Sequence, residues 1–143
     1  MKRNHDAETE RIFCKHNLQH SIDVARVAYI LSLERELQLS KEVIYATGLL
    51  HDIGRWEEYA NGISHAEASA VLSEKILVDS GFDSAEREMI LDAIKNHRKN
   101  GKRETPLSVV IYESDKISRL CLECEEIGDC NRFCSGEKPT LMY

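Results

Sequence analysis

Residues 49–55 read LLHDIGR, so an apolar run ends in an adjacent histidine and aspartate. His51 and Asp52 are costly to bury in a small core unless both side chains have partners. A metal ion is a common strong partner for both, because a neutral imidazole offers one lone pair and a carboxylate can bind one metal or bridge two. The stretch therefore raises the question of whether the rest of the chain supplies more ligands.

The segments on either side of this stretch show apolar residues at helical spacing. The spacing predicts helices over about residues 17–37, 41–51, 64–79 and 83–97, and a last helix from residue 105. Residues 1–16 are predicted to be a polar lead-in with one short helix, and residues 55–63 a loop that turns at Asn61-Gly62. Capping residues are found at the expected helix starts: Ser40, Ser64 with Glu67, Asp83 with Glu86, and Thr105 before Pro106.

No stretch has the pattern of a convincing strand, an internal repeat or a linker. The predicted fold is therefore all-α: a single-domain helical bundle over residues 1–120, followed by a short cysteine-rich extension over residues 121–143. A chain of 143 residues is long enough to bury one core unaided.

Composition narrows the function classes. The formal net charge of -6 argues against nucleic acid as the main partner, because a phosphate backbone needs a basic face. No run approaches the ~20 apolar residues of a membrane span, and the polar start MKRNHDAETER does not resemble a signal peptide. Five cysteines without a secretion signal favour a reducing cytoplasm, where thiols bind metal or react.

Ionisable side chains accumulate on the apolar faces of the predicted helices. The set comprises four of the six histidines and two aspartates: His20, His51, Asp52, His65, His97 and Asp115. Each of these side chains would need its own hydrogen-bond partners if it were only a core residue. Six converging ligands are too many for one tetrahedral zinc ion, but they suit two metals that share a bridging carboxylate.

This order of residues resembles the H…HD…H…H…D pattern of the HD superfamily of metal-dependent phosphohydrolases, over about residues 16–120. The resemblance implies a helical bundle with a metal-binding core, and the two intervening histidines imply its dinuclear branch. It assigns the ligands of the first metal to His20, His51 and Asp115, those of the second to His65 and His97, and the bridging position to Asp52. The implied cofactors are two divalent transition metal ions drawn from iron, manganese, nickel, cobalt and zinc.

Charge suggests what such a centre would do. Two divalent ions carry four positive charges and two carboxylates carry two negative ones, so the centre keeps a net charge of +2. This charge can turn a bridging water into hydroxide and hold phosphate oxygens. Asp52 and Arg55 are the predicted catalytic residues, and Arg55 and Lys116 the predicted substrate-binding residues. Arg119 and the loop cations Arg98, Lys99, Lys102 and Arg103 are weaker candidates.

The roles of Arg55 and His16 are each open to a second interpretation. Several dinuclear members have a lysine three residues after the HD aspartate, where this chain has Arg55. Arginine can clamp phosphate through its planar fork but is a poor proton donor, and simple solvent exposure is the alternative. His16 precedes His20 by the spacing of one helical turn, and is given only a supporting or substrate role.

The cysteines of the extension form the pattern C-x2-C-x5-C-x3-C. Cys121, Cys124, Cys130 and Cys134 have pair spacings that suit a structural zinc site, although their connecting segment is shorter than in zinc ribbons. An iron–sulfur cluster or free, redox-active thiols are the alternatives.

The favoured function is hydrolysis of a phosphomonoester or phosphoanhydride bond in a nucleotide-like small molecule. The dinuclear branch includes enzymes that split diadenosine tetraphosphate and enzymes that cut cyclic dinucleotides. Two other classes stay open: a mixed-valent diiron oxygenase of the same superfamily, and a metal- or redox-responsive binding module without turnover. A phosphorylated small molecule is the expected partner, with no nucleic acid and no membrane, and a homo-oligomer is possible.

Overall fold

The computed structural model describes residues 1–98, 101–133 and 138–143. It is all-α, as predicted, and the described residues contain no strand. Its α-helices are α1 (Lys2–Ala7), α2 (Leu18–Glu34), α3 (Lys41–Leu50), α4 (Arg55–Asn61), α5 (His65–Asp79), α6 (Ser84–Asn96) and α7 (Pro106–Ile117). Two short 3-10 helices, η1 (Cys121–Glu123) and η2 (Ile127–Asp129), follow α7. None of the described helices is long and apolar enough to cross a membrane.

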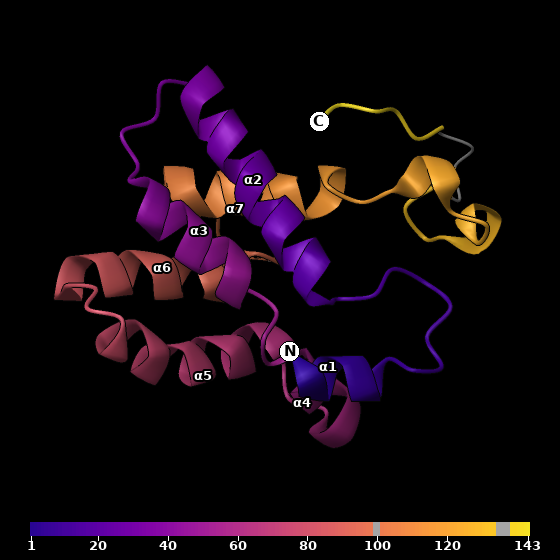
Figure 1. The fold of residues 1–143 in the computed structure, drawn as a ribbon, viewed down its shortest axis with the longest axis horizontal. Helices are drawn as coiled ribbons and strands as arrows, with labels where there is room; N and C mark the ends of the chain where they lie inside the picture. The colour runs from indigo at the N-terminus through magenta and orange to yellow at the C-terminus, as the bar shows by residue number, and fades with distance from the viewer. Residues whose placement is uncertain (99–100, 134–137) are drawn as a thin grey trace.

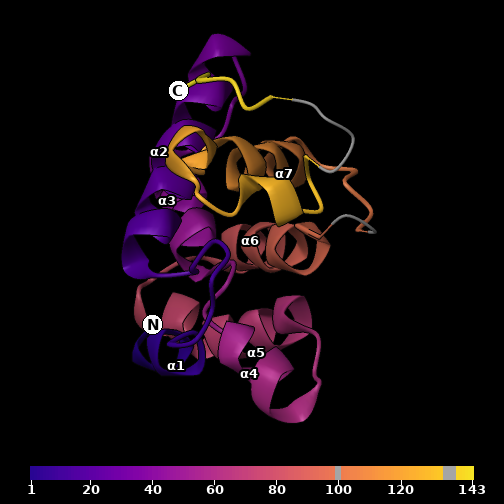
Figure 2. The same ribbon diagram turned by 90° about the vertical axis from the view of Figure 1, so that its right-hand side faces the viewer.

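The helices stack in layers that bring distant segments together (Figure 1). Helix α2 packs against α3 and α7, while α6 packs against α3, α5 and α7. Helices α1 and α4 lie together beside the start of α5, away from the end of the molecule that carries η1 and η2 (Figure 2). The starts of α2, α4 and α5 and the ends of α3, α6 and α7 therefore approach one region.

Apolar side chains at the predicted helical spacing form the core. The largest fully buried ones come from α3, α5, α6 and α7: Ile44, Leu77, Ile90, Ile94, Leu107 and Ile111. Burying a side chain of this size stabilises a fold by roughly 1.5–3 kcal/mol. The core thus fixes the helices whose polar residues face the candidate site.

Two glycines permit close approaches that position the HD stretch. A Cβ at Gly48 would lie 2.7 Å from the Cα of Ala25, so α3 approaches α2 only because residue 48 has no side chain. A Cβ at Gly54 would lie 2.5 Å from the backbone nitrogen of Ser69, and the Gly54 N–H donates to Ser69 Oγ at 2.9 Å. These contacts hold residues 48–54 against α2 and α5.

Most predicted helix caps form. Ser40 accepts from the Val43 N–H, and both Asp83 with Glu86 and Thr105 with Ser108 form reciprocal capping boxes. Helix α5 begins after Ser64, as predicted, but the capping box with Glu67 does not form, because Ser64 makes no side-chain cap bond. Glu58 of α4 supplies an acceptor at that helix start, taking the His65 N–H at 3.3 Å.

The prediction of a loop over residues 55–63 is also wrong, since residues 55–61 form α4. Two acidic residues in its first turn, Glu57 and Glu58, favour the helix through its macrodipole. Asn4 of α1 accepts the Trp56 N–H at 3.1 Å, which satisfies a free donor at the helix start. Gly62, with φ of 70°, ends the helix at the position expected for the turn.

Candidate metal centre

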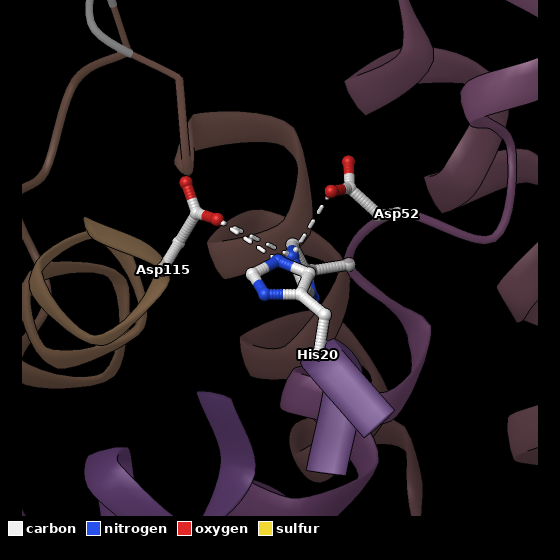
Figure 3. A group of neighbouring side chains, drawn as sticks. His20, Asp52 and Asp115 are labelled. Atoms are coloured by element: carbon white, nitrogen blue, oxygen red, sulfur yellow. Dashed lines mark ion pairs between the residues drawn. The ribbon is translucent and has the colours of Figure 1, made fainter. Parts of the chain in front are cut away.

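Three of the six predicted ligands form a first lobe at the start of α2 and the ends of α3 and α7. His20 Nε2 lies 3.2 Å from Asp115 Oδ1, and His51 Nε2 lies 3.9 Å from the same oxygen. Figure 3 shows the side chains of His20, Asp52 and Asp115 converging on one region. One ligand atom from each of His20, His51, Asp52 and Asp115 lies within 4.8 Å of the others, close enough to share one ion.

The second lobe comprises His65 at the start of α5 and His97 at the end of α6. Their Nε2 atoms are 3.1 Å apart, and they lie 3.3 and 3.5 Å from Asp52 Oδ1. The other oxygen of that carboxylate, Oδ2, lies 3.2 Å from His51 Nε2. Asp52 therefore faces both lobes, one oxygen to each, as a bridging carboxylate would.

The imidazole rings are oriented by hydrogen bonds on the side away from the centre. His51 Nδ1 donates to the Gly48 carbonyl at 2.7 Å, and His97 Nδ1 donates to the Ile94 carbonyl at 2.6 Å. His65 Nδ1 donates to the Glu58 carboxylate. Each bond leaves Nε2 with its lone pair directed inward, the arrangement that outer partners impose on metal-binding histidines.

Buried polar atoms without hydrogen-bond partners test whether a metal fits here. Among the described residues, three such atoms belong to the predicted ligands: His20 Nε2, His51 Nε2 and Asp52 Oδ1. Buried polar atoms are seldom left unpaired. A divalent cation in the first lobe would satisfy His20 Nε2 and His51 Nε2, and one in the second lobe would satisfy Asp52 Oδ1, so the residues present fit metal ions.

Local electrostatics favour the metal-binding protonation states of Asp52, Asp115 and His65. Burial alone would raise the pKa of Asp52 and of Asp115. At Asp52 the neighbouring His51 outweighs this effect of burial, and at Asp115 the neighbouring His20 and Arg119 do so. Both pKa values therefore lie well below the ordinary range. Burial lowers the pKa of His65 to about 4. At neutral pH the carboxylates are therefore ionised and His65 is neutral.

The same carboxylates attract positive charge to the centre. Burial would lower the pKa of His51, but Asp52 and Asp115 raise it instead. Two carboxylates within 4 Å of this completely buried imidazole make the site attractive to a cation. A metal ion would supply that charge in place of a proton.

A cavity of about 710 Å³ opens onto the centre. Asp52, His65, His97 and Asp115 line it, together with six cationic residues: Arg11, Arg55, Arg98, Lys116, Arg119 and Arg132. Lys102 and Arg103, two weaker sequence candidates, are not in its wall, and Lys99 falls outside the described residues. The centre is thus reached through a pocket with a strong excess of positive side chains.

The predicted substrate-binding residues lie beside the ligands. Arg55 is partly buried, which contradicts simple solvent exposure, and its Nη1 lies 2.7 Å from Nδ1 and 3.1 Å from Nε2 of His65. Lys116 Nζ donates to Asp115 Oδ2 at 2.5 Å. Both cations are therefore placed at the junction of the ligand set and the cavity.

Arg119, only a weak candidate from the sequence, makes direct hydrogen bonds to the predicted ligand Asp115. Its Nη2 donates to Asp115 Oδ1 at 2.6 Å, and its Nε donates to the Asp115 carbonyl at 2.8 Å. Lys116 and Arg119 thus each hold one oxygen of the same carboxylate. The four-residue spacing of Asp115 and Arg119, about one helical turn, was the available signal, and the contact forms although α7 ends at Ile117.

His16 is not on the helix that carries His20, because α2 begins at Leu18 after the cap Asn17. The interpretation of one helical turn between the two histidines is therefore wrong. His16 is nevertheless buried: Nδ1 donates to Glu8 Oε1 at 2.5 Å, and Nε2 lies 3.9 Å from Asp52 Oδ2. Its supporting or substrate role stays a prediction.

Residues of the polar lead-in also reach the centre, although no sequence pattern indicated them. Asn4 is buried and donates to the Asp52 carbonyl at 2.7 Å. Glu8 accepts from Tyr59 Oη at 2.7 Å as well as from His16. Burial would raise the pKa of Glu8, but the hydrogen bonds and charge of His16 lower it to about 2. Both contacts join segments about 50 residues apart, which no local pattern encodes.

The cysteines are only partly described. Cys121, Cys124 and Cys130 are half-buried and free of disulfides, while Cys134 lies outside the described residues. In the part of the chain that is described, no thiol joins a set of ligand atoms all within 4.8 Å of one another. The four-cysteine zinc or iron–sulfur site stays a prediction.

Comparison with known proteins identifies the class. A profile described as the HD domain matches residues 17–120, a range that includes all six clustered residues, and the chain belongs to this family. An uncharacterized protein of Clostridium beijerinckii is 43% identical over 131 residues, which cover 92% of this chain and 82% of that protein.

More distant relatives are ribonuclease Y proteins. Those of Enterococcus faecalis and Lawsonia intracellularis are 32% and 34% identical over about 71% of this chain. The chain spans only 18% of the length of each. No solved structure matches the chain. Family membership and the buried His/Asp cluster together indicate a metal-binding protein of hydrolytic type.

Proposed function

We propose that this protein is a metal-dependent phosphohydrolase that acts on a nucleotide-like small molecule. The observation that carries the proposal is the pairing of a buried, two-lobed His/Asp cluster with a cavity of about 710 Å³ lined by cationic side chains. The cluster suits metal ions and the cavity walls suit phosphate. Neither feature by itself would distinguish hydrolysis from simple metal storage.

In this proposal His20, His51 and Asp115 bind a first divalent transition metal ion, and His65 and His97 bind a second. Asp52 bridges the two, consistent with one oxygen facing each lobe. Bound metals of this kind supply Lewis acidity and lower the pKa of a coordinated water. The protein's own contribution is to hold the ligands ionised or neutral as needed and to orient the imidazoles from Gly48, Ile94 and Glu58.

Arg55 and Lys116 are the proposed phosphate-binding residues. Arg55 reaches the second lobe and Lys116 the first, so their charges flank the centre from two sides. Arginine keeps its charge throughout the accessible pH range, because Asp52 opposes the effect of burial and raises its pKa further. Arg55 therefore acts as a clamp on phosphate oxygens and not as a proton donor.

The test is turnover by the full chain, loaded separately with Mn²⁺, Fe²⁺, Co²⁺, Ni²⁺ or Zn²⁺. Substrates are nucleoside mono-, di- and triphosphates, diadenosine tetraphosphate and p-nitrophenyl phosphate, with phosphate release as the readout. Metal-dependent release that disappears in Asp52→Asn supports the proposal. Oxygen consumption by the iron form with no phosphate release favours the diiron oxygenase, and tight metal binding with neither activity favours a binding module.

RNA is a second candidate substrate, favoured by the match to ribonuclease Y of Enterococcus faecalis over a segment of similar length to the HD domain. The net charge of -6 opposes general nucleic-acid binding, although the cavity wall is locally cationic. A short single-stranded RNA in the same assay separates the two candidates. Cleavage of RNA at a higher kcat/KM than any mononucleotide would replace the small-molecule proposal.

A further inference from the structure

Two cavities share a cationic wall beside the candidate metal centre. One is the cavity of about 710 Å³ that opens onto the centre (the large cavity), and the other has a volume of about 170 Å³ (the small cavity). Both are lined by Lys116, Arg119, Cys121 and Arg132. Lys138 adds a fourth cation to the small cavity, and no carboxylate of the described residues lines it. The small cavity therefore has the charge of an anion site.

Lys116 and Arg119 connect the small cavity to the candidate metal centre. Lys116 Nζ donates to Asp115 Oδ2 at 2.5 Å, and Arg119 Nη2 donates to Asp115 Oδ1 at 2.6 Å. One layer of side chains therefore separates the small cavity from a predicted ligand of the first metal. Adjacent phosphates of one molecule are joined through a single oxygen atom, so this short separation suits a phosphate at the centre and its neighbour in the small cavity.

Arg132 differs from the other cations of the large cavity in its partners. The other five each have a carboxylate oxygen within 4.0 Å: Arg11, Arg55, Arg98, Lys116 and Arg119. Arg132 has none among the described residues, and its Nη1 donates to the carbonyl of Lys116. A guanidinium has five N–H donors, and this bond uses one of them. Arg132 can therefore bind a phosphate oxygen while it stays attached to α7.

The turn that carries Arg132 is held in place from two sides. The Phe133 N–H donates to the Cys130 carbonyl at 2.9 Å, which closes the turn. The Arg132 guanidinium lies 5.1 Å from the centroid of the Phe133 ring and bonds α7 through the Lys116 carbonyl. An arginine held in this way loses less conformational entropy when it binds a ligand. The turn lies outside residues 17–120, which match the HD domain, so this cation is an addition to the family's site.

We propose that the small cavity is a phosphate site in which Arg132 binds the second phosphate of the substrate. The inference rests on the proposed function and narrows it, because the substrate must then carry at least two linked phosphates. Nucleoside diphosphates, nucleoside triphosphates and dinucleotide polyphosphates meet this condition, and nucleoside monophosphates do not. The bond that is hydrolysed is accordingly a phosphoanhydride.

The reaction follows from this placement. Water attacks the phosphorus of the phosphate held between Arg55 and Lys116. The water oxygen forms a new bond to phosphorus, the P–O bond to the bridging oxygen breaks, and the second phosphate leaves with that oxygen and its electron pair. The proton lost by the water passes to solvent. Arg132 stabilises the negative charge that develops on the leaving phosphate.

Binding of methylene diphosphonate to the metal-loaded full chain tests the site. Its P–C–P link cannot be hydrolysed, and methylphosphonate supplies the comparison with a single anionic group. Arg132→Ala should lower the affinity for the diphosphonate about 10-fold, the scale of one lost hydrogen bond to a charged group, and the affinity for methylphosphonate much less. Arg26→Ala is the control, because the Arg26 side chain is 60% exposed on α2. Unchanged diphosphonate affinity in Arg132→Ala overturns the site, and an equal loss for both anions overturns the link to a second phosphate.

A second measurement needs no substitution and so does not depend on the folding of a variant. Arginines of the metal-loaded wild type are modified with phenylglyoxal, with and without methylene diphosphonate, and mapped by peptide mass spectrometry. Slower modification of Arg132 in the presence of the diphosphonate, with Arg26 unchanged, supports the site. Modification of Arg132 at the same rate in both samples overturns it.

Kinetics separate this inference from the proposed function. In Arg132→Ala the ratio of kcat/KM for adenosine diphosphate to that for adenosine monophosphate should fall about 10-fold. A ratio equal to that of the wild type overturns the role of Arg132 and leaves the phosphohydrolase proposal intact. Absence of phosphate release from every substrate rejects the proposed function and with it the substrate assignment, whereas the diphosphonate result concerns the anion site alone.

Discussion

The two lobes of the candidate metal centre differ in charge and in support. The first lobe, with His20 and His51, has a carboxylate of its own in Asp115, which Lys116 and Arg119 hold by hydrogen bonds. The second lobe has two histidines, His65 and His97, and its carboxylate is Asp52, which it shares with the first lobe. Its outer support, Glu58, is on the short helix α4.

This difference predicts unequal metal affinity. A divalent ion in the first lobe faces two carboxylates and one in the second lobe faces a single shared carboxylate, so the Coulomb attraction is weaker in the second. The second metal should therefore be removed first when a chelator is titrated into the loaded protein. Loss of both metals in a single step would mean that the lobes act as one unit and that the comparison fails.

The largest expected effect comes from His65→Ala, which removes half of the imidazole ligands of the second lobe. About one of two metals per chain should be lost, and kcat/KM should fall by roughly 10³-fold, the scale of one lost metal's charge stabilisation. Elemental analysis and phosphate release measure the two quantities. His5→Ala, at an exposed histidine, is the matched control, and unchanged metal content in His65→Ala would contradict a dinuclear centre.

Arg55→Ala should leave both metals in place and lower kcat/KM by about 10²-fold, because a charge-assisted clamp on phosphate is lost. Arg26→Ala on α2 is the control, since the Arg26 side chain is 60% exposed. Steady-state kinetics on the best substrate, with metal content measured in parallel, distinguish the clamp from a metal effect. Equal kinetics in the two variants would remove Arg55 from the site.

Glu58→Gln tests whether the second lobe depends on α4. The variant loses the ionised acceptor of the His65 Nδ1–H, and an outer partner of this kind affects metal affinity by about 10-fold or more. The affinity for the second metal should fall and the affinity for the first should not change, as measured by chelator titration. Glu57→Gln, on the same helix and bonded to Asn61, is the control, and an equal effect on both metals would refute the separate support of the lobes.

The smallest expected effect concerns Glu8, which supports the centre through His16. Its pKa is lowered from 4.5 to about 2 on folding, so its carboxylate stabilises the fold above pH 4.5, and this contribution is lost as the pH falls toward 2. Thermal unfolding between pH 6 and 3 should show a shallower loss of Tm in Glu8→Gln than in the wild type. Parallel pH profiles would show that Glu8 ionises alike in the folded and unfolded chain.

Regular helices made much of this protein predictable. On α2, for example, Val24, Ala28 and Leu31 are buried at helical spacing, and such patterns indicated the helix faces that carry the six clustered residues. The short helix α4 could not be predicted in this way, because a segment of seven residues has no stable helix of its own. Its helical form depends on Asn4 and on packing against α1 and α5.

The sequence alone determined the helical class, the helix faces and the identity of the residues that could bind metal, because each of these depends on local periodicity and side-chain chemistry. It could not determine that Glu58 orients His65, that Tyr59 reaches Glu8, or that Asn4 reaches the carbonyl of Asp52. Except for Glu58 and His65, these contacts join segments dozens of residues apart. Such contacts arise when helix packing closes long loops, and the free energy of that closure has no signature in any short stretch of the chain.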